Sequence, residues 1–168
     1  TLASALRAQP YEDLDFAKID HHREIRQGFP EVIFGAGKTP EQLAEIARRI
    51  VSSNQPLLIT RVETDAVTAV RAEIPAATYH PSARLITHGG PDQPTGRGLV
   101  LVVTAGTSDQ PVAEEAALTA EMMGNRVDRL YDVGVAGLHR LLSARERLEA
   151  AQVIVVAAGM EGALPSVV

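Results

Sequence analysis

The chain has 168 residues, a hydrophobic content of 45% and a formal net charge of −5. This length is enough for one large domain or two small ones, and the hydrophobic content is normal for a globular protein. Acidic and basic residues are mixed along it, whereas nucleic-acid-binding proteins concentrate lysine and arginine on one face, so we expect no nucleic-acid partner. No apolar run reaches the length of a membrane span, and the absence of cysteine excludes disulfides and thiolate sites within these residues. We expect a cytoplasmic protein without a membrane partner.

The first 28 residues give weak structural signals. Residues 1–13 carry a short helical pattern interrupted by Pro10, and residues 14–28 are dense in charge without a clean helical or strand period. We expect polar chemistry or an interface in this charged segment. Because the chain begins at Thr1 and stops at Val168 within an apolar stretch, we also expect a fragment of a longer polypeptide, truncated at its C-terminus.

Residues 31–88 predict a small α/β domain with its own core. After a strand over 31–34, Thr39 is the expected helix cap and Pro40 occupies the first helical position. The apolar face of this helix is formed by Leu43, Ile46, Ala47 and Ile50. The remaining elements are strands over 57–60, 77–80 and 84–88 and a helix over 64–73.

Residues 89–97 are rich in glycine and proline and form the expected linker between two domains, 1–88 and 98–168. Beyond the linker, strands and helices alternate, which predicts a parallel, doubly wound sheet that binds ligands at the carboxyl ends of its strands. The predicted elements are strands over 99–103, 125–131 and 153–157, a helix over 111–123, and a helical region over 138–150 broken near Ser143. The helix over 111–123 is expected to place Val112, Ala116, Ala120 and Met123 on one face.

The strand over 99–103 and the turn after it indicate an anion site. Five consecutive large aliphatic residues are typical of a strand buried on both faces. Gly106 can adopt a positive φ and lets a ligand approach, while Ser108 or Asp109 can cap a helix whose first turn accepts Pro111. The N–H groups and the positive end of that helix favour a phosphate, but an ordinary strand-to-helix turn has the same pattern.

Two further turns follow the next two strands and should open on the same edge of the sheet. Gly134 and Gly137 suit close backbone approach, and His139 and Arg140 can meet a phosphate. Glu161 is a carboxylate in an otherwise apolar turn, where partial desolvation would let it exchange a proton near neutral pH. Each residue also has an ordinary structural explanation. His139 can be a histidine at a helix end, Arg140 a solvated charge, and Glu161 an acid in the first turn of a helix, where the dipole favours it.

The charged segment near the N-terminus has no metal motif, because the adjacent residues His21 and His22 point to different sides of a helix or a strand. Its arginines can clamp a second phosphate or a carboxylate. A salt-bridged surface is the alternative for them.

Four runs of sequence resemble the LarB family, whose C-terminal domain is similar to PurE, the aminoimidazole ribonucleotide carboxylase. They are FAKIDHHREIRQGFPEVIF at 16–34, VTAGTSD at 103–109, DVGVAGLHR at 132–140 and AAGMEGALPSV at 157–167. The resemblance covers nearly the whole chain. It implies an α/β fold in which a small N-terminal α/β domain precedes a PurE-like doubly wound parallel sheet.

LarB-type enzymes begin the synthesis of the nickel-pincer nucleotide cofactor. The resemblance implies a carboxylase and hydrolase that converts nicotinic acid adenine dinucleotide and carbon dioxide to pyridinium-3,5-biscarboxylic acid mononucleotide and AMP. That chemistry uses a thiolate that adds to the ring and a carboxylate that removes the ring proton. The resemblance further implies no tightly bound cofactor, no indicated divalent ion or other metal, and a homo-oligomer, an octamer as in PurE.

The resemblance also assigns roles to particular residues. Glu161 matches the catalytic carboxylate of the family. Asp20, Arg23 and Arg26 lie in the N-terminal motif and are expected to contact the substrate or an interface. The nucleotide and phosphate site is expected to comprise Gly106, Thr107, Ser108, Asp109, Gly134, Ala136, Gly137, His139, Arg140, Gly159 and Met160.

The sequence departs from the family pattern in its lack of cysteine. The family cysteine follows the GMEG turn, in a segment that these residues do not contain, so we expect them to be inactive in carboxylation by themselves. Two other functions stay open, an aminoimidazole ribonucleotide carboxylase of purine biosynthesis and a catalytically silent nucleotide-binding module. The purine enzyme is disfavoured because its phosphate loop lies at the start of its chain, whereas about ninety residues precede the loop here.

Overall fold

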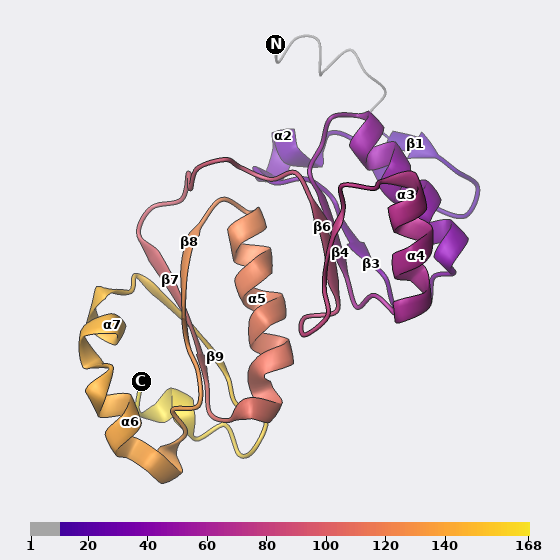
Figure 1. Cartoon of the computed structure of the whole chain (residues 1–168). Helices are drawn as coiled ribbons and strands as arrows, with labels where there is room; N and C mark the ends of the chain where they lie inside the picture. The colour runs from indigo at the N-terminus through magenta and orange to yellow at the C-terminus, as the bar shows by residue number, and fades with distance from the viewer. Residues whose placement is uncertain (1–10) are drawn as a thin grey trace. The chain divides into compact units, whose positions relative to one another are not determined.

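A computed structural model describes residues 11–168 (Figure 1). The helical pattern expected before Tyr11 therefore lies outside the described residues. The chain divides into an N-terminal unit that ends at Gly90 and a C-terminal unit that begins at Pro91, with Pro81–Ala83 grouped with the latter. Among the described residues, no helix is long and apolar enough to cross a membrane.

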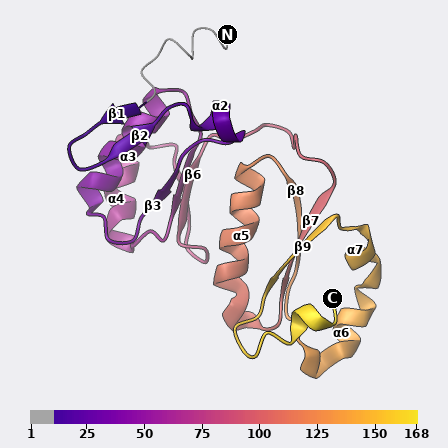
Figure 2. The ribbon, with the colours of Figure 1, turned by 180° about the vertical axis from the view of Figure 1, so that it is seen from behind.

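The N-terminal unit contains two sheets, a short antiparallel pair β1-β2 and a four-stranded mixed sheet in the order β3-β4-β6-β5. Helices α3 and α4 lie side by side on one face of the larger sheet (Figures 1 and 2). The elements are β1 (Tyr11–Asp13), β2 (Lys18–Asp20), α2 (Arg23–Gln27), β3 (Val32–Phe34), α3 (Pro40–Ser52), β4 (Leu57–Thr60), α4 (Thr64–Glu73), β5 (Thr78–His80) and β6 (Leu85–His88).

Helix α3 begins as its sequence predicts. The Thr39 hydroxyl accepts the Gln42 N–H at 3.3 Å, and the Gln42 side-chain oxygen accepts the Thr39 N–H at 3.0 Å, which closes a capping box. The four predicted apolar residues of the helix are all buried, and they form the centre of the core with Leu57, Ile59 and Ile86 from the sheet. Burial of this face, more than local propensity, holds α3 in place.

The charged segment over 14–28 contains strand β2 and helix α2, which no periodic pattern in the sequence reveals. Strand β2 has three residues, of which Ile19 alone is buried. A single buried residue defines no period, so the pairing of β2 with β1 is decided by tertiary contacts.

The C-terminal unit is a three-stranded parallel sheet in the order β8-β7-β9. Helix α5 covers one face, and α6 and α7 cover the other, which is a doubly wound arrangement (Figures 1 and 2). The predicted α/β fold class is confirmed. The elements are β7 (Leu99–Thr104), the 3-10 turn η1 (Thr107–Asp109), α5 (Gln110–Met122), β8 (Arg126–Leu130), η2 (Val135–Gly137), α6 (Leu138–Ser143), α7 (Arg145–Ala150), β9 (Val153–Ala157) and η3 (Leu164–Ser166).

Strand β7 is the central strand and is covered on both faces. Leu101 and Val103 pack in one cluster with Leu141 of α6, while Val102 faces Ala113 of α5. The predicted two-sided burial is confirmed from Leu101 onward, and Leu99 and Val100 at the start of the strand are half-buried.

The four residues predicted to share one face of α5 do not form its buried face. The buried residues are Ala113 and Ala117, whereas Val112 is 57% exposed and Met123 is 38% exposed. Small side chains let the helix axis approach the sheet, so the alanines occupy the contact and the larger residues are turned outward. Strand β9 also differs from the expected buried strand: it lies at the sheet edge and Val153 is 53% exposed.

Candidate active site

Three turns leave the carboxyl ends of β7, β8 and β9 and are joined by hydrogen bonds. The turn after β8 is attached to the end of β7, because Val133 N–H donates to Thr104 O at 3.0 Å and Gly134 N–H donates to Ala105 O at 2.9 Å. The backbone therefore brings together the segments that the sequence places at one sheet edge.

Thr104 is a residue of this edge that the sequence analysis missed. It is fully buried, and its hydroxyl oxygen accepts the Asp132 N–H at 3.0 Å. A buried polar side chain needs a partner, and this one fixes the start of the second turn. Its sequence signal is a threonine directly after an aliphatic strand, where a hydroxyl can satisfy a loop amide.

Asp109 joins the first and third turns. One of its carboxylate oxygens accepts the Gly106 N–H at 3.0 Å, and the other accepts the Gly159 N–H at 2.8 Å. Residues that lie fifty positions apart in the chain are thus held by one side chain. Asp109 is the N-cap residue of α5, one of the two expected caps, but its side chain makes no cap bond to α5 and binds the two glycine amides instead.

Gly106 is extended, with φ of −145°, so the expected positive φ is wrong. A Cβ built there would meet Asp109 Oδ2 alone, at 4.0 Å, which leaves open space over the loop. Thr107 and Ser108 are exposed, and their N–H groups open the 3-10 turn. The loop can therefore admit an anion at Gly106 without a change in backbone conformation.

The second turn needs Gly134 for packing, because a backbone oxygen lies beside it, whereas the atoms that face Gly137 belong to the flexible Arg140 side chain. A Cβ on Gly134 would lie 2.7 Å from Ala105 O, and a Cβ on Gly137 would lie 2.6 Å from Arg140 Nε. The Arg140 guanidinium lies against Gly137 and pairs with Asp132, which has a φ of 58°. Arg140 is thus held within its own turn, and Ala136 and His139 are exposed beside it in sequence.

The third turn carries Glu161 at its tip. Gly162 N–H donates to Met160 O at 2.7 Å, Glu161 has a φ of 60°, and Met160 is 82% exposed. Leu164, which is 1% exposed, anchors the far end of the turn in the core. Glu161 is exposed, so the expected desolvation of its carboxylate is not present in this chain. The reason is that its neighbours in sequence are glycines and a methionine that is itself solvated.

Residues 11–89 match the model of a family described as the LarB/PurE-like N-terminal domain. Residues 11–89 are therefore a LarB/PurE-like N-terminal domain, which supports the resemblance of the chain to the LarB family. This match supports the PurE-related carboxylase family that the resemblance implies. An uncharacterized protein of Methanocaldococcus jannaschii is 37% identical over 167 residues, which cover 94% of this chain and 65% of that relative. The chain thus spans about two thirds of the length of the relative that it matches.

The three predicted contact residues of the LarB/PurE-like N-terminal domain lie in or beside α2. Arg26 forms an ion pair with Asp20, and Arg23 donates to the Gln27 side chain at 3.1 Å and lies over the ring of Phe29. The hydrogen bond from Arg26 lowers the pKa of Asp20, with burial opposing it and the His22 N–H adding to it. Arg26 and Asp20 thus form a salt bridge of the kind named as the alternative, and the contact of the three residues with a substrate or an interface stays a prediction.

The described residues contain no cluster of three or more histidine, aspartate or glutamate side chains that could hold a metal ion. His21 lies 3.5 Å from the Glu12 carboxylate, and its main-chain oxygen accepts from the Gln55 side chain at 3.1 Å. The adjacent histidines therefore take part in local contacts of the N-terminal unit.

Proposed function

We propose that this chain forms the nucleotide-binding part of an enzyme that carboxylates the pyridinium ring of nicotinic acid adenine dinucleotide and hydrolyses its phosphoanhydride. The products are pyridinium-3,5-biscarboxylic acid mononucleotide and AMP. The observation that carries the proposal is the Asp109 carboxylate, which joins the Gly106 loop to the turn that bears Glu161. Under this proposal, the bond connects a phosphate loop to a proton acceptor, and the LarB/PurE-like N-terminal domain that precedes them supports this assignment.

The phosphate groups of the dinucleotide would use the Gly106 loop. The exposed hydroxyls of Thr107 and Ser108 and the first N–H groups of the 3-10 turn are donors, and the loop ends at the N-terminus of α5. The Asp109 carboxylate is occupied by two amides, so its negative charge is partly compensated before a phosphate arrives.

Glu161 would take the ring proton. A thiolate first adds to the pyridinium ring, and the neighbouring ring carbon attacks carbon dioxide to form the new carbon–carbon bond. Glu161 then removes the proton from that carbon as the thiolate leaves, which restores the aromatic ring. Because the chain has no cysteine, the thiol must come from outside these 168 residues.

Glu161 and Met160 are exposed, so we propose that the bound dinucleotide or a neighbouring copy covers them in a homo-oligomer, an octamer as in PurE. Cover of this kind would exclude water and strengthen the interaction of the carboxylate with the ring proton.

The test follows carbon dioxide incorporation and AMP release in parallel, using the native gene product that contains this sequence and measuring its intact mass. Incorporation into nicotinic acid adenine dinucleotide supports the proposal. Incorporation into aminoimidazole ribonucleotide would instead identify the purine enzyme, and nucleotide binding without turnover would identify a silent module.

Glu161→Gln gives the sharper comparison. It should lower carboxylation at least about 100-fold and leave binding of the dinucleotide unchanged, because the amide cannot accept the proton. Glu146→Gln, at an exposed glutamate of α7, is the matched control and should leave both unchanged. Normal carboxylation by Glu161→Gln would remove Glu161 from the mechanism.

A further inference from the structure

The N-terminal unit has a cavity of about 330 Å³ between β2, β3 and the start of α3. Its floor is apolar, since Ile19, Ile33 and Ile46 are each at most 5% exposed. Its rim carries Phe16 and Phe34, which are 48% and 58% exposed. All of its lining residues belong to this unit, so the cavity is complete within it.

The cavity is rich in lysine and phenylalanine, which are both rare in the chain. The chain contains two lysines, Lys18 and Lys38, and both line this cavity. Two of its three phenylalanines also line it, and both are exposed although aromatic rings are normally buried. Exposed rings beside an apolar floor are typical of a surface that binds a ligand.

The charges at the cavity favour an anion. Lys38 Nζ donates to Phe34 O at 2.9 Å and makes no ion pair within residues 11–168, so an ammonium group is available there. Lys18 lies 3.5 Å from the exposed carboxylate of Asp13, a distance that gives a weak, solvent-screened pair. The remaining acid, Glu31, already accepts the Asp20 N–H.

We propose that this cavity binds a small molecule that combines one planar ring with an anionic group, either a carboxylate or a phosphate. The ring lies on the isoleucine floor between Phe16 and Phe34, and the anion meets Lys18 and Lys38. The volume is at the lower end of the range for small-molecule sites, which suits one ring system and not a dinucleotide. Binding here does not depend on the proposed carboxylation.

The two lysines allow a direct test on the full chain. Reductive methylation with ¹³C-formaldehyde keeps the lysine charge and gives separate NMR signals for Lys18, Lys38 and the N-terminal amine. The C-terminal unit contains no lysine, so both lysine signals report on the N-terminal unit. Benzoate and AMP are the two probes, one for a ring with a carboxylate and one for a ring with a phosphate.

We expect saturable shifts of both lysine signals with benzoate or with AMP, and the probe that binds more tightly identifies the anion. Acetate, inorganic phosphate and benzyl alcohol, which each lack the ring or the anion, should bind at least tenfold more weakly. Phe34→Ser should weaken binding at least tenfold, while Val112→Ser, at an exposed apolar residue of α5, should not change it. Equal shifts with acetate or phosphate, or no saturable shift with either ring probe, would overturn the proposal.

Discussion

At the scale of single residues, Asp109 decides the geometry of the candidate site. The sequence suggests a helix cap or a phosphate contact, and the carboxylate instead bonds to two backbone amides of its own chain. A carboxylate that accepts N–H groups at 2.8 Å and 3.0 Å is fixed in orientation, so it aligns the turns on either side of it. Asp109 is therefore a positioning residue for Glu161.

Asp109→Asn should loosen the third turn. The amide nitrogen cannot accept an N–H, so one of the two bonds is lost and the free energy of unfolding of the C-terminal unit falls by about 1–2 kcal/mol. Hydrogen exchange at Gly159 or at Gly106 should accelerate, as measured by NMR. Asp92→Asn, at an exposed residue near the start of the C-terminal unit, is the control, and unchanged protection at both glycines would contradict this role.

Alanine substitutions at two glycines of the site can show which glycine is needed for folding and which for ligand binding. Gly134→Ala should lower the free energy of unfolding by about 1–3 kcal/mol, because the new Cβ would lie 2.7 Å from Ala105 O. Gly106→Ala should leave stability unchanged or slightly raised, because its Cβ meets nothing closer than 4.0 Å.

Nucleotide binding then distinguishes the two variants. If a phosphate approaches Gly106, the alanine variant should bind nicotinic acid adenine dinucleotide at least tenfold more weakly while it unfolds at the wild-type temperature. Calorimetric binding and thermal unfolding of both variants provide the comparison. Wild-type affinity in Gly106→Ala would exclude the loop as the phosphate site.

At the scale of elements, the predictability of this fold depends on how many local signals agree. Helix α3 has a capping pair, a proline at its start and an apolar period, and all three point to the same boundaries. Helix α5 has alanines and larger apolar residues at overlapping helical spacings, so its buried face at Ala113 and Ala117 is set by contact with the sheet. Three-residue strands such as β2 carry no period at all.

The candidate site likewise has one part that the sequence predicts and one that it does not. Parallel strands present their carboxyl ends together, so the convergence of three turns follows from the βα alternation. The bonds of Thr104 and Asp109 do not follow from it, because they join residues far apart in the chain through side chains whose orientations depend on the finished fold. Glu161 is exposed for a similar reason, since no local pattern specifies what covers a turn.

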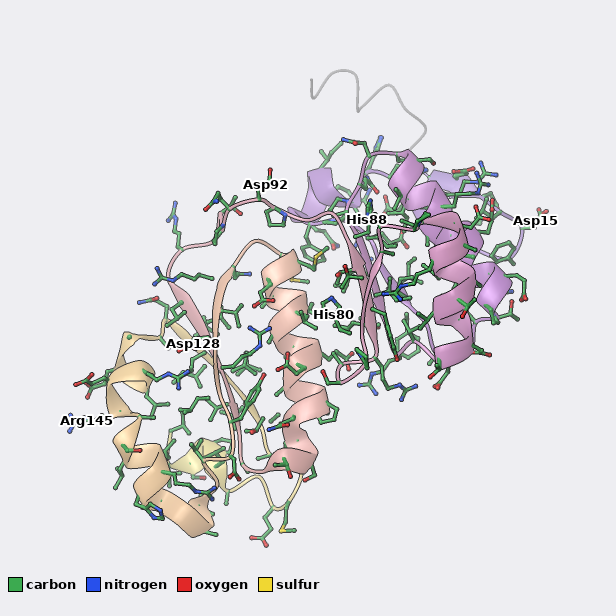
Figure 3. The ribbon with its side chains drawn as sticks, in the orientation of Figure 1. Asp15, His80, His88, Asp92, Asp128 and Arg145 are labelled. Carbon is green, nitrogen blue, oxygen red and sulfur yellow. The ribbon has the colours of Figure 1, made fainter. Side chains whose placement is uncertain are left out.

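Helix α7 is attached to β8 by a charge pair that should make its docking sensitive to acid. Asp128, which is labelled on β8 in Figure 3, accepts hydrogen bonds from Arg147 at both carboxylate oxygens. These bonds measure 2.7 Å and 2.9 Å, and Arg147 also donates to Arg129 O at 2.6 Å. Burial raises the pKa of Asp128, but the bonds from Arg147 and from the Arg129 N–H outweigh it, so the pKa lies below its usual value.

A folded-state pKa below the unfolded value means that the pair stabilises the protein above about pH 4 and that this contribution is lost as pH falls through the folded pKa. Asp128→Asn should therefore lower the midpoint of denaturant unfolding at pH 7, where the pair is charged. At about pH 3 the difference between the variant and the wild type should be smaller than at pH 7, because Asp128 becomes protonated as the pH falls. Circular dichroism of urea unfolding at both pH values measures the two midpoints. A difference between the variant and the wild type that does not change with pH would show that the charge of Asp128 does not contribute to stability.

At the scale of the whole molecule, the main apolar cores stay within their units. The cluster around α3 and α4 draws its members from residues between Leu14 and Ile86, whereas the two clusters around β7 draw theirs from residues between Val100 and Leu164. No residue belongs to more than one of these clusters. Since burial of apolar surface supplies most of the cooperativity of folding, each unit has its own source of stability.

Mutations in one core should therefore act on one unit. Ile50→Val, at a fully buried residue of α3, should lower the stability of the N-terminal unit by about 1 kcal/mol and speed hydrogen exchange there, with β7 to β9 unchanged. Leu141→Ala, buried against β7, should cost about 2–5 kcal/mol in the C-terminal unit and leave α3 and α4 protected. Native-state exchange followed by mass spectrometry resolves both effects, and equal acceleration in the two units would show that they unfold as one.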